Sequence, residues 1–229
     1  MKKTVLTIML LAVLVLSLAG CGKAPSAENK TPAAEAQSAA ESLFPAEDAA
    51  PAGEAEAAAP SGRQDGERFE ATNMLEGMEE TVAYEHVRNE SVGFELDYEY
   101  EDLERRSDLE SESFISRWDD ANDPWNYLEI RSDTGNANLV ADALAATLRG
   151  IYDSVSYEES TLERAGSCIM ISASGAKDDL APAGSLQTVY VIPAGSGCLV
   201  ATAHCTWESA EGFGRRFSYM MDTLTVIGQ

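Results

Sequence analysis

One serine and one lysine in this chain have the spacing used by a class of serine hydrolases. Ser174 and Lys177 fit Ser-x-x-Lys, but that chemistry needs the serine at a buried helix start with the lysine on the next turn. Ser174 is instead predicted to end a strand and enter a polar loop. No Ser-Asp-Asn, Lys-Thr-Gly or Gly-x-Ser-x-Gly motif accompanies the pair. The pattern therefore does not favour an acyl-transfer enzyme.

Two histidines, His86 and His204, are the residues of the type most often used as general bases. Both fall in predicted strands. His204 and its neighbour Cys205 should point to opposite faces of a sheet, which is wrong for an ion pair and for shared metal ligation. A zinc site that combines them with Cys168 and Cys198 is therefore disfavoured. The sequence predicts buried or half-buried strand residues, no metal and no catalysis.

An acidic turn offers the oxygen ligands that calcium prefers. Asp119, Asp120, Asn122 and Asp123 lie in "DDANDP", a turn by composition between two predicted strands. Hard cations take oxygen ligands from such loops, but the spacing is not that of an EF-hand. A calcium loop and an ordinary hairpin turn are both open interpretations of this pattern.

Acidic residues dominate the charge. The net charge is −23, of which residues 1–20 carry +2 and residues 21–66 carry −5, so residues 67–229 carry −20. Each contact with a phosphate needs a lysine or an arginine, so this balance argues against nucleic acids and anionic lipid headgroups as partners. In so acidic a domain, chance alone will place some pair of carboxylates at the separation that glycosidases use. No pair is therefore named as a catalytic candidate.

Three cysteines are predicted to belong to the folded domain. Cys198 and Cys205 are seven positions apart on one predicted strand, hence on opposite faces and about 20 Å or more apart. An intervening strand would hold Cys168 about 10 Å from Cys198. The three are therefore predicted to be buried free thiols.

The first 20 residues have the organisation of an export signal. Lys2 and Lys3 form a basic start, and an apolar run over residues 5–19 follows with no charge before Lys23. The run, about 15 residues, is shorter than the roughly 20 that a membrane span needs. The sequence "LAGC" at positions 18–21 then resembles the lipobox of bacterial lipoproteins.

The lipobox resemblance implies the fate of Cys21. In such lipoproteins the signal is cut before the cysteine, here between Gly20 and Cys21, and the thiol takes a diacylglyceryl group, which palmitate labels. Two acyl chains hold a protein stably on a bilayer. The implied location is the extracytoplasmic face of the cell membrane, with the covalent lipid and no other cofactor.

Residues 21–66 are predicted to be a disordered stalk. They are rich in alanine, proline, glutamate and serine, and only Leu43 and Phe44 are bulky and apolar. So little burial cannot offset the entropy lost on ordering. A coil of this length spans roughly 40 Å on average, so the segment would lift the rest of the chain off the membrane surface.

Residues 67–229 suffice for one domain with its own core. Helical spacing occurs over residues 138–152, with Asn138 as the cap, and over residues 209–224, with Ser209 as the cap. Strand-like alternation or strand-forming composition occurs over residues 82–86, 92–98, 114–118, 125–131, 155–162, 168–174, 186–192 and 198–207. Strand meanders with inserted helices predict an α+β domain with a mainly antiparallel sheet flanked by helices.

The order of these segments resembles a known family. "GFELDY", "NYLEI", an amphipathic helix, a meander and the ending "CLVATAHCTWESAEGFGRRFSYMMDTLTV" are similar to bacterial lipoproteins with a PsbP-like domain. "EGMEETV" and the ending are most similar to their Firmicutes branch. The resemblance covers roughly residues 75–227. It implies an α/β/α sandwich over residues 67–229 and a non-catalytic or accessory role at the envelope, because such relatives generally have no assigned reaction.

The leading hypothesis is a membrane-anchored lipoprotein whose non-catalytic domain binds or scaffolds another envelope protein. Arg215 and Arg216 stand out in the acidic domain as candidates for partner docking or for salt bridges to local glutamates. A solute- or glycan-binding lipoprotein is the alternative, and it would have a deep pocket lined by Trp118, Trp125 or Trp207. An envelope hydrolase, a further alternative, would need a cleft with a perturbed carboxylate or an ordered Ser–Lys contact.

Overall fold

The computed structural model describes residues 62–75, 78–120, 122–177, 181 and 184–228. The predicted export signal, Cys21 and the stalk up to residue 61 lie outside the described residues. Neither helix in the described part of the chain has the length and apolar composition needed to cross a bilayer.

Four strands form the smaller of two sheets. Its order is β1-β2-β3-β11, and every neighbouring pair is antiparallel. The strands are β1 (Arg68–Leu75), β2 (Met78–Asn89), β3 (Phe94–Glu99) and β11 (Thr225–Val226). Gly93 has a φ of 99° in the tight turn from β2 to β3, where a residue with a side chain would be strained.

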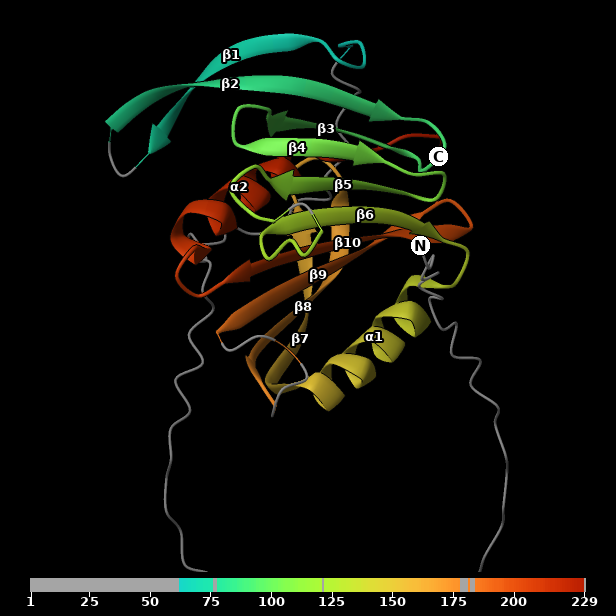
Figure 1. Cartoon of the computed structure of the whole chain (residues 1–229). Helices are drawn as coiled ribbons and strands as arrows, with labels where there is room; N and C mark the ends of the chain where they lie inside the picture. The colour runs from blue at the N-terminus through green and yellow to red at the C-terminus, as the bar shows by residue number, and fades with distance from the viewer. Residues whose placement is uncertain (1–61, 76–77, 121, 178–180, 182–183, 229) are drawn as a thin grey trace, which may run out of the picture. The chain divides into compact units, whose positions relative to one another are not determined.

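Seven strands form the larger sheet, which is also antiparallel throughout, in the order β4-β5-β6-β10-β9-β8-β7. The strands are β4 (Leu103–Ser107), β5 (Ser111–Ser116), β6 (Tyr127–Asp133), β7 (Tyr152–Leu162), β8 (Gly166–Ala176), β9 (Ser185–Ala194) and β10 (Gly197–Thr206). Helix α1 (Ala137–Ile151) connects β6 to β7, and helix α2 (Ala210–Thr223) follows β10 (Figure 1). The predicted α+β class with mainly antiparallel pairing is confirmed, with two sheets in place of one.

The larger sheet is buried on both faces at its centre. Alternate residues of β9 and β10 join two different apolar clusters, as a side-chain period of two requires. Ile192 and Leu199 belong to the cluster shared with the smaller sheet and α2, whereas Val191 and Val200 belong to the cluster shared with α1. Figure 1 shows α1 across one face of the larger sheet, on the side away from the smaller sheet. Each fully buried side chain of this size contributes about 1.5–3 kcal/mol.

Both helices begin near the predicted residues but differ from the prediction in their caps. Asn136, and not Asn138, caps α1: its backbone is extended, and its side chain accepts a 3.0 Å hydrogen bond from the Asn138 backbone N. Ser209 precedes α2 as predicted, yet its side chain makes no capping bond. Its backbone is already helical, whereas a capping side chain needs an extended residue.

All eight predicted strands are present, with shifted ends near the tryptophans. β5 ends at Ser116, β6 begins at Tyr127 and β10 ends at Thr206. Trp118 and Trp125 therefore lie in the connection between β5 and β6 rather than in strands. β1 and β4, which the pattern did not predict, are edge strands of the smaller and the larger sheet.

Candidate functional site

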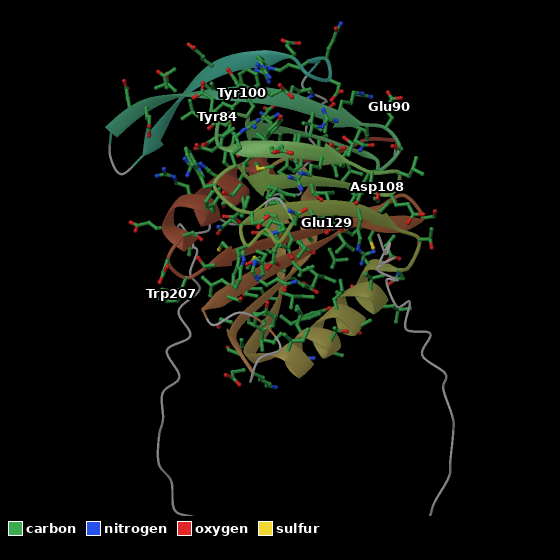
Figure 2. All side chains as sticks on the ribbon, in the orientation of Figure 1. Tyr84, Glu90, Tyr100, Asp108, Glu129 and Trp207 are labelled. Carbon is green, nitrogen blue, oxygen red and sulfur yellow. The ribbon has the colours of Figure 1, made fainter. Side chains whose placement is uncertain are left out.

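Three neighbouring strands of the larger sheet have ends that lie side by side, on the side of the sheet where β5 and β10 end and β6 begins. β6 lies between β5 and β10 and is antiparallel to both. The end of β5, the start of β6 and the end of β10 therefore share an edge, with neighbouring strands about 5 Å apart. Trp118, Trp125 and Trp207 lie one or two residues beyond these ends. We call these three residues the tryptophan edge; Figure 2 shows Trp207 beyond the end of β10.

The tryptophan edge is exposed. The exposed fraction is 77% for Trp118, 62% for Trp207 and 37% for Trp125, and these are the three tryptophans of the chain. Tryptophan is on average highly buried in folded proteins, and large exposed apolar groups that gather at one place mark interaction sites. Sequence reasoning named the three residues as lining for a pocket, and the structure gathers them on a surface.

Asp119 holds the turn that carries Trp118 against the start of β6. Its Oδ2 accepts hydrogen bonds from the backbone N of Trp125 at 2.7 Å and of Asn126 at 2.6 Å. The backbone N of Trp118 donates to Ser116 Oγ at 3.1 Å. The backbone N–H groups of Trp118, Trp125 and Asn126 thus have fixed partners, and these hydrogen bonds order both segments.

Asn126 joins the turn that carries Trp207 to the same framework. Its side chain is buried, and its Nδ2 donates to the Asp119 carboxylate oxygens at 3.1 and 3.2 Å. Its Oδ1 accepts from Ser209 Oγ and from the Thr206 backbone N, the latter at 3.4 Å. Thr206 and Ser209 flank Trp207. One buried amide therefore links all three tryptophan segments.

His204 on β10 fixes the Trp125 segment from within the sheet. Its Nδ1 lies 2.6 Å from the carbonyl oxygen of Trp125, and its ring stacks on Tyr127 with centroids 5.3 Å apart. A carbonyl only accepts, so Nδ1 carries the proton in this contact. Burial lowers the pKa of His204 below its ordinary value, which keeps the imidazole neutral at neutral pH. The prediction of a buried strand histidine is confirmed.

His86 on β2 faces two carboxylates of β3. Its Nδ1 lies 2.7 Å from Asp97 Oδ1, and its Nε2 lies 3.9 Å from Glu95 Oε2, which also pairs with Arg88 Nη1 at 2.9 Å. His86, Glu95 and Asp97 are 1%, 1% and 3% exposed, so this arrangement links two strands in the interior rather than facing solvent. Sequence reasoning placed His86 in a strand but missed both carboxylates, because strand register was not readable.

Arg216 attaches α2 to the smaller sheet. Its Nε lies 2.7 Å from Glu99 Oε2, and its Nη2 pairs with Asp102. Both partners are far away in sequence, so the expected local glutamates are not its partners. Burial raises the pKa of Glu99, and the charge of Arg216 partly offsets this. Arg216 and the exposed Arg215 line an acidic cleft of about 290 Å³, and partner docking through them stays a prediction.

The Ser-x-x-Lys pair does not come together as a catalytic contact. Ser174 lies in β8, as predicted. The Lys177 Nζ donates to the carbonyl oxygen of Arg149 at 2.5 Å, at the end of α1. The lysine therefore closes a helix end, where a cation and a free carbonyl interact favourably.

Cys168, Cys198 and Cys205 are buried free thiols, as predicted. β9 lies between β8 and β10 and separates Cys168 from Cys198. Burial raises the pKa of Cys168 and of Cys205 to about 11. Both thiols are therefore protonated at neutral pH and behave as small apolar side chains.

The acidic turn is occupied by its own hydrogen bonds. Asp119 accepts from two backbone N–H groups, and Asp120 Oδ1 accepts from the Asn122 backbone N at 2.9 Å. Such contacts are those of an ordinary hairpin turn. Among the described residues, no group of three or more histidine, cysteine, aspartate or glutamate side chains is placed to hold a metal ion.

Comparison with known proteins places the chain in no family. No protein-family model matches it, and neither does any curated protein. A solved structure from Bacteroides thetaiotaomicron VPI-5482 is similar over 59% of this chain and 46% of its own length, at 12% identity and a TM-score of 0.36. LpqN of Mycobacterium tuberculosis, described as involved in cell envelope biogenesis, is similar over 63% of this chain and 91% of its own, at 15% identity and a TM-score of 0.41. At these TM-scores neither likeness supports a conclusion on family or function, and the PsbP-like and Firmicutes resemblance stays a prediction.

Proposed function

We propose that this chain is an exported lipoprotein, anchored through Cys21 on the extracytoplasmic face of the cell membrane, whose α+β domain is a non-catalytic binding module for another envelope protein. The tryptophan edge is the surface that contacts the partner. The anchor rests on the basic start, the apolar run and "LAGC" at positions 18–21.

One observation carries the binding role: three exposed tryptophans are held at one edge by a hydrogen-bond framework centred on the buried Asn126. Tryptophan is enriched among the few residues that supply most of the energy at protein interfaces. Ordering a loop on binding costs free energy, and the contacts of Asp119 and Asn126 have already ordered these segments. A surface that is apolar and preorganised is the kind that a folded partner uses.

The contacts of the residues considered as catalytic candidates support a non-catalytic role. His86 is buried between carboxylates, His204 donates to a backbone carbonyl, and Lys177 closes a helix end. Each of these side chains makes a structural contact, and both histidine rings are buried away from solvent. The net charge of −23 also favours partners other than nucleic acid.

A protein partner is favoured over a small solute because a solute needs an enclosed pocket. Three clefts of about 370, 290 and 290 Å³ are lined by residues of other parts of the domain, and none of them includes a tryptophan. The three indole rings are themselves exposed, and they offer contact area that suits a protein surface.

Crosslinking of the full-length, lipidated chain in its own membranes tests this function. The wild type should give a discrete crosslinked partner, and Trp118→Ala/Trp207→Ala should reduce that product by about tenfold or more, because each lost anchor weakens binding. Leu109→Ala/Leu139→Ala is the matched control, since it removes two side chains that are 88% and 70% exposed elsewhere. Equal crosslinking by the tryptophan variant and the wild type would contradict the proposal.

A further inference from the structure

The geometry points to a cationic segment of the partner as the occupant of the tryptophan edge: lysine or arginine side chains lie over the indole faces and their charges face the carboxylates beside them. This inference rests on the proposed function and names the chemistry of the partner. Its argument depends on which charges surround the three rings.

The two segments that carry the tryptophan edge are acidic. Residues 117–126 hold three aspartates and residues 206–211 hold two glutamates, against one basic residue, Arg117. The Arg117 Nε donates to the carbonyl oxygen of Tyr100 at 3.1 Å, so its guanidinium is directed to the turn before β4. The negative charges beside the rings are therefore not neutralised from within these segments.

Four of these carboxylates are exposed and have no ion pair among the described residues: Asp120, Asp123, Glu208 and Glu211. Asp123 lies two positions before Trp125, and Glu208 directly follows Trp207. Elsewhere, arginines of the domain pair with carboxylates inside the fold, as Arg105 does with Glu112 and Arg216 with Glu99. A cation from outside is the complement that Asp123 and Glu208 lack.

Indole is the best of the side-chain rings for binding a cation over its face. An exposed tryptophan beside an unpaired carboxylate therefore attracts an ammonium or guanidinium group twice, through the ring quadrupole and through charge. An anionic lipid surface is repelled by the same carboxylates, and a neutral glycan gains nothing from them. A basic protein segment matches both features of this edge.

Hexalysine is a direct probe, and tryptophan fluorescence is a local reporter, because all three tryptophans of the chain lie at this edge. Hexalysine should change the tryptophan fluorescence of the folded chain with saturation, and its affinity should fall as salt rises. Hexaserine of the same length should leave the fluorescence unchanged.

Variants separate this site from the general negative field of the domain. Asp123→Asn/Glu208→Gln should weaken hexalysine binding by about tenfold, whereas Glu110→Gln/Glu158→Gln, which removes two exposed negative charges elsewhere, should change it by less than about twofold. Trp118→Ala/Trp207→Ala should also bind hexalysine about tenfold more weakly, as measured by calorimetry.

Equal weakening by the two charge variants would overturn the inference, because binding would then follow net charge alone. A fluorescence change with soluble peptidoglycan fragments or with phosphatidylcholine vesicles, but not with hexalysine, would overturn it in favour of those occupants. If the crosslinked partner depends on Trp118 and Trp207 but not on Asp123 and Glu208, the proposed function stands and this inference fails.

Discussion

At the scale of single residues, the positioning of the tryptophan edge depends on Asn126, which is itself buried. Its amide is bonded to Asp119 on one side and to Ser209 on the other. Replacing this buried amide would remove one hydrogen-bond partner from Asp119 and one from Ser209.

Asn126→Ala should lower the free energy of unfolding by about 1–3 kcal/mol, because it removes the hydrogen bonds that the buried amide makes to Asp119 and Ser209. Urea unfolding, followed by far-UV circular dichroism, measures this. Asn122→Ala in the same connection removes an exposed side chain and should stay within about 0.5 kcal/mol of the wild type. An Asn126→Ala variant as stable as the wild type would show that the framework does not hold these segments.

Residue types alone did not identify the partners of several side chains. The sequence placed Asp119 in a turn and Ser209 at a helix start, without the residues that each contacts. In the structure Asp119 accepts from the Trp125 and Asn126 backbone, and Ser209 Oγ reaches Asn126. A carboxylate or a hydroxyl has several possible partners, and the one it finds depends on segments distant in the chain.

At the scale of elements, Glu112 of β5 joins the two sheets. Its side chain is fully buried and accepts from Arg105 Nε at 2.5 Å and Ser107 Oγ at 2.6 Å, both on β4, and from Asn89 Nδ2 at 2.6 Å, on β2. β2 and β4 belong to different sheets. This carboxylate therefore carries a polar link across an otherwise apolar interface.

Glu112→Ala should lower the free energy of unfolding by about 3–5 kcal/mol, since it removes the buried carboxylate that Arg105 and Asn89 share and leaves Arg105 only its exposed partner Asp65. Chemical denaturation of the domain gives the value. Glu110→Ala, two residues earlier and exposed, serves as the control and should change stability by less than about 0.5 kcal/mol. A loss below about 1 kcal/mol for Glu112→Ala would mean that apolar packing alone holds the sheets together.

Long helices and strands with a clear hydrophobic period were predictable from the sequence, whereas edge strands were not. β9 and β10 have apolar residues on both faces and were found, as were both helices. β1 and β4 are edge strands with several polar residues, "RFEATNML" and "LERRS", and the pattern missed them. An edge strand buries less, so its sequence is less constrained by burial.

At the scale of the whole molecule, the proposed lipid anchor at Cys21 would decide where the acidic domain works. The wild type should incorporate labelled palmitate and sediment with membranes, and Cys21→Ala should do neither, because it removes the thiol that we propose as the acceptor of the lipid. Cys198→Ala should still incorporate the label, since that cysteine is buried in β10. Equal labelling of Cys21→Ala and the wild type would contradict a lipid anchor at Cys21.

The sequence by itself determined the class of this domain, because the periods of helices and strands and the composition of turns are local properties. The acidic character and the lipobox pattern are equally visible in the residues. Only the tertiary structure decided which side chains meet. Asn126 and Ser209 are 83 positions apart, and Arg216 and Glu99 are 117 apart. Such contacts depend on the order and register of strands, which arise from the packing of the whole domain rather than from any single segment.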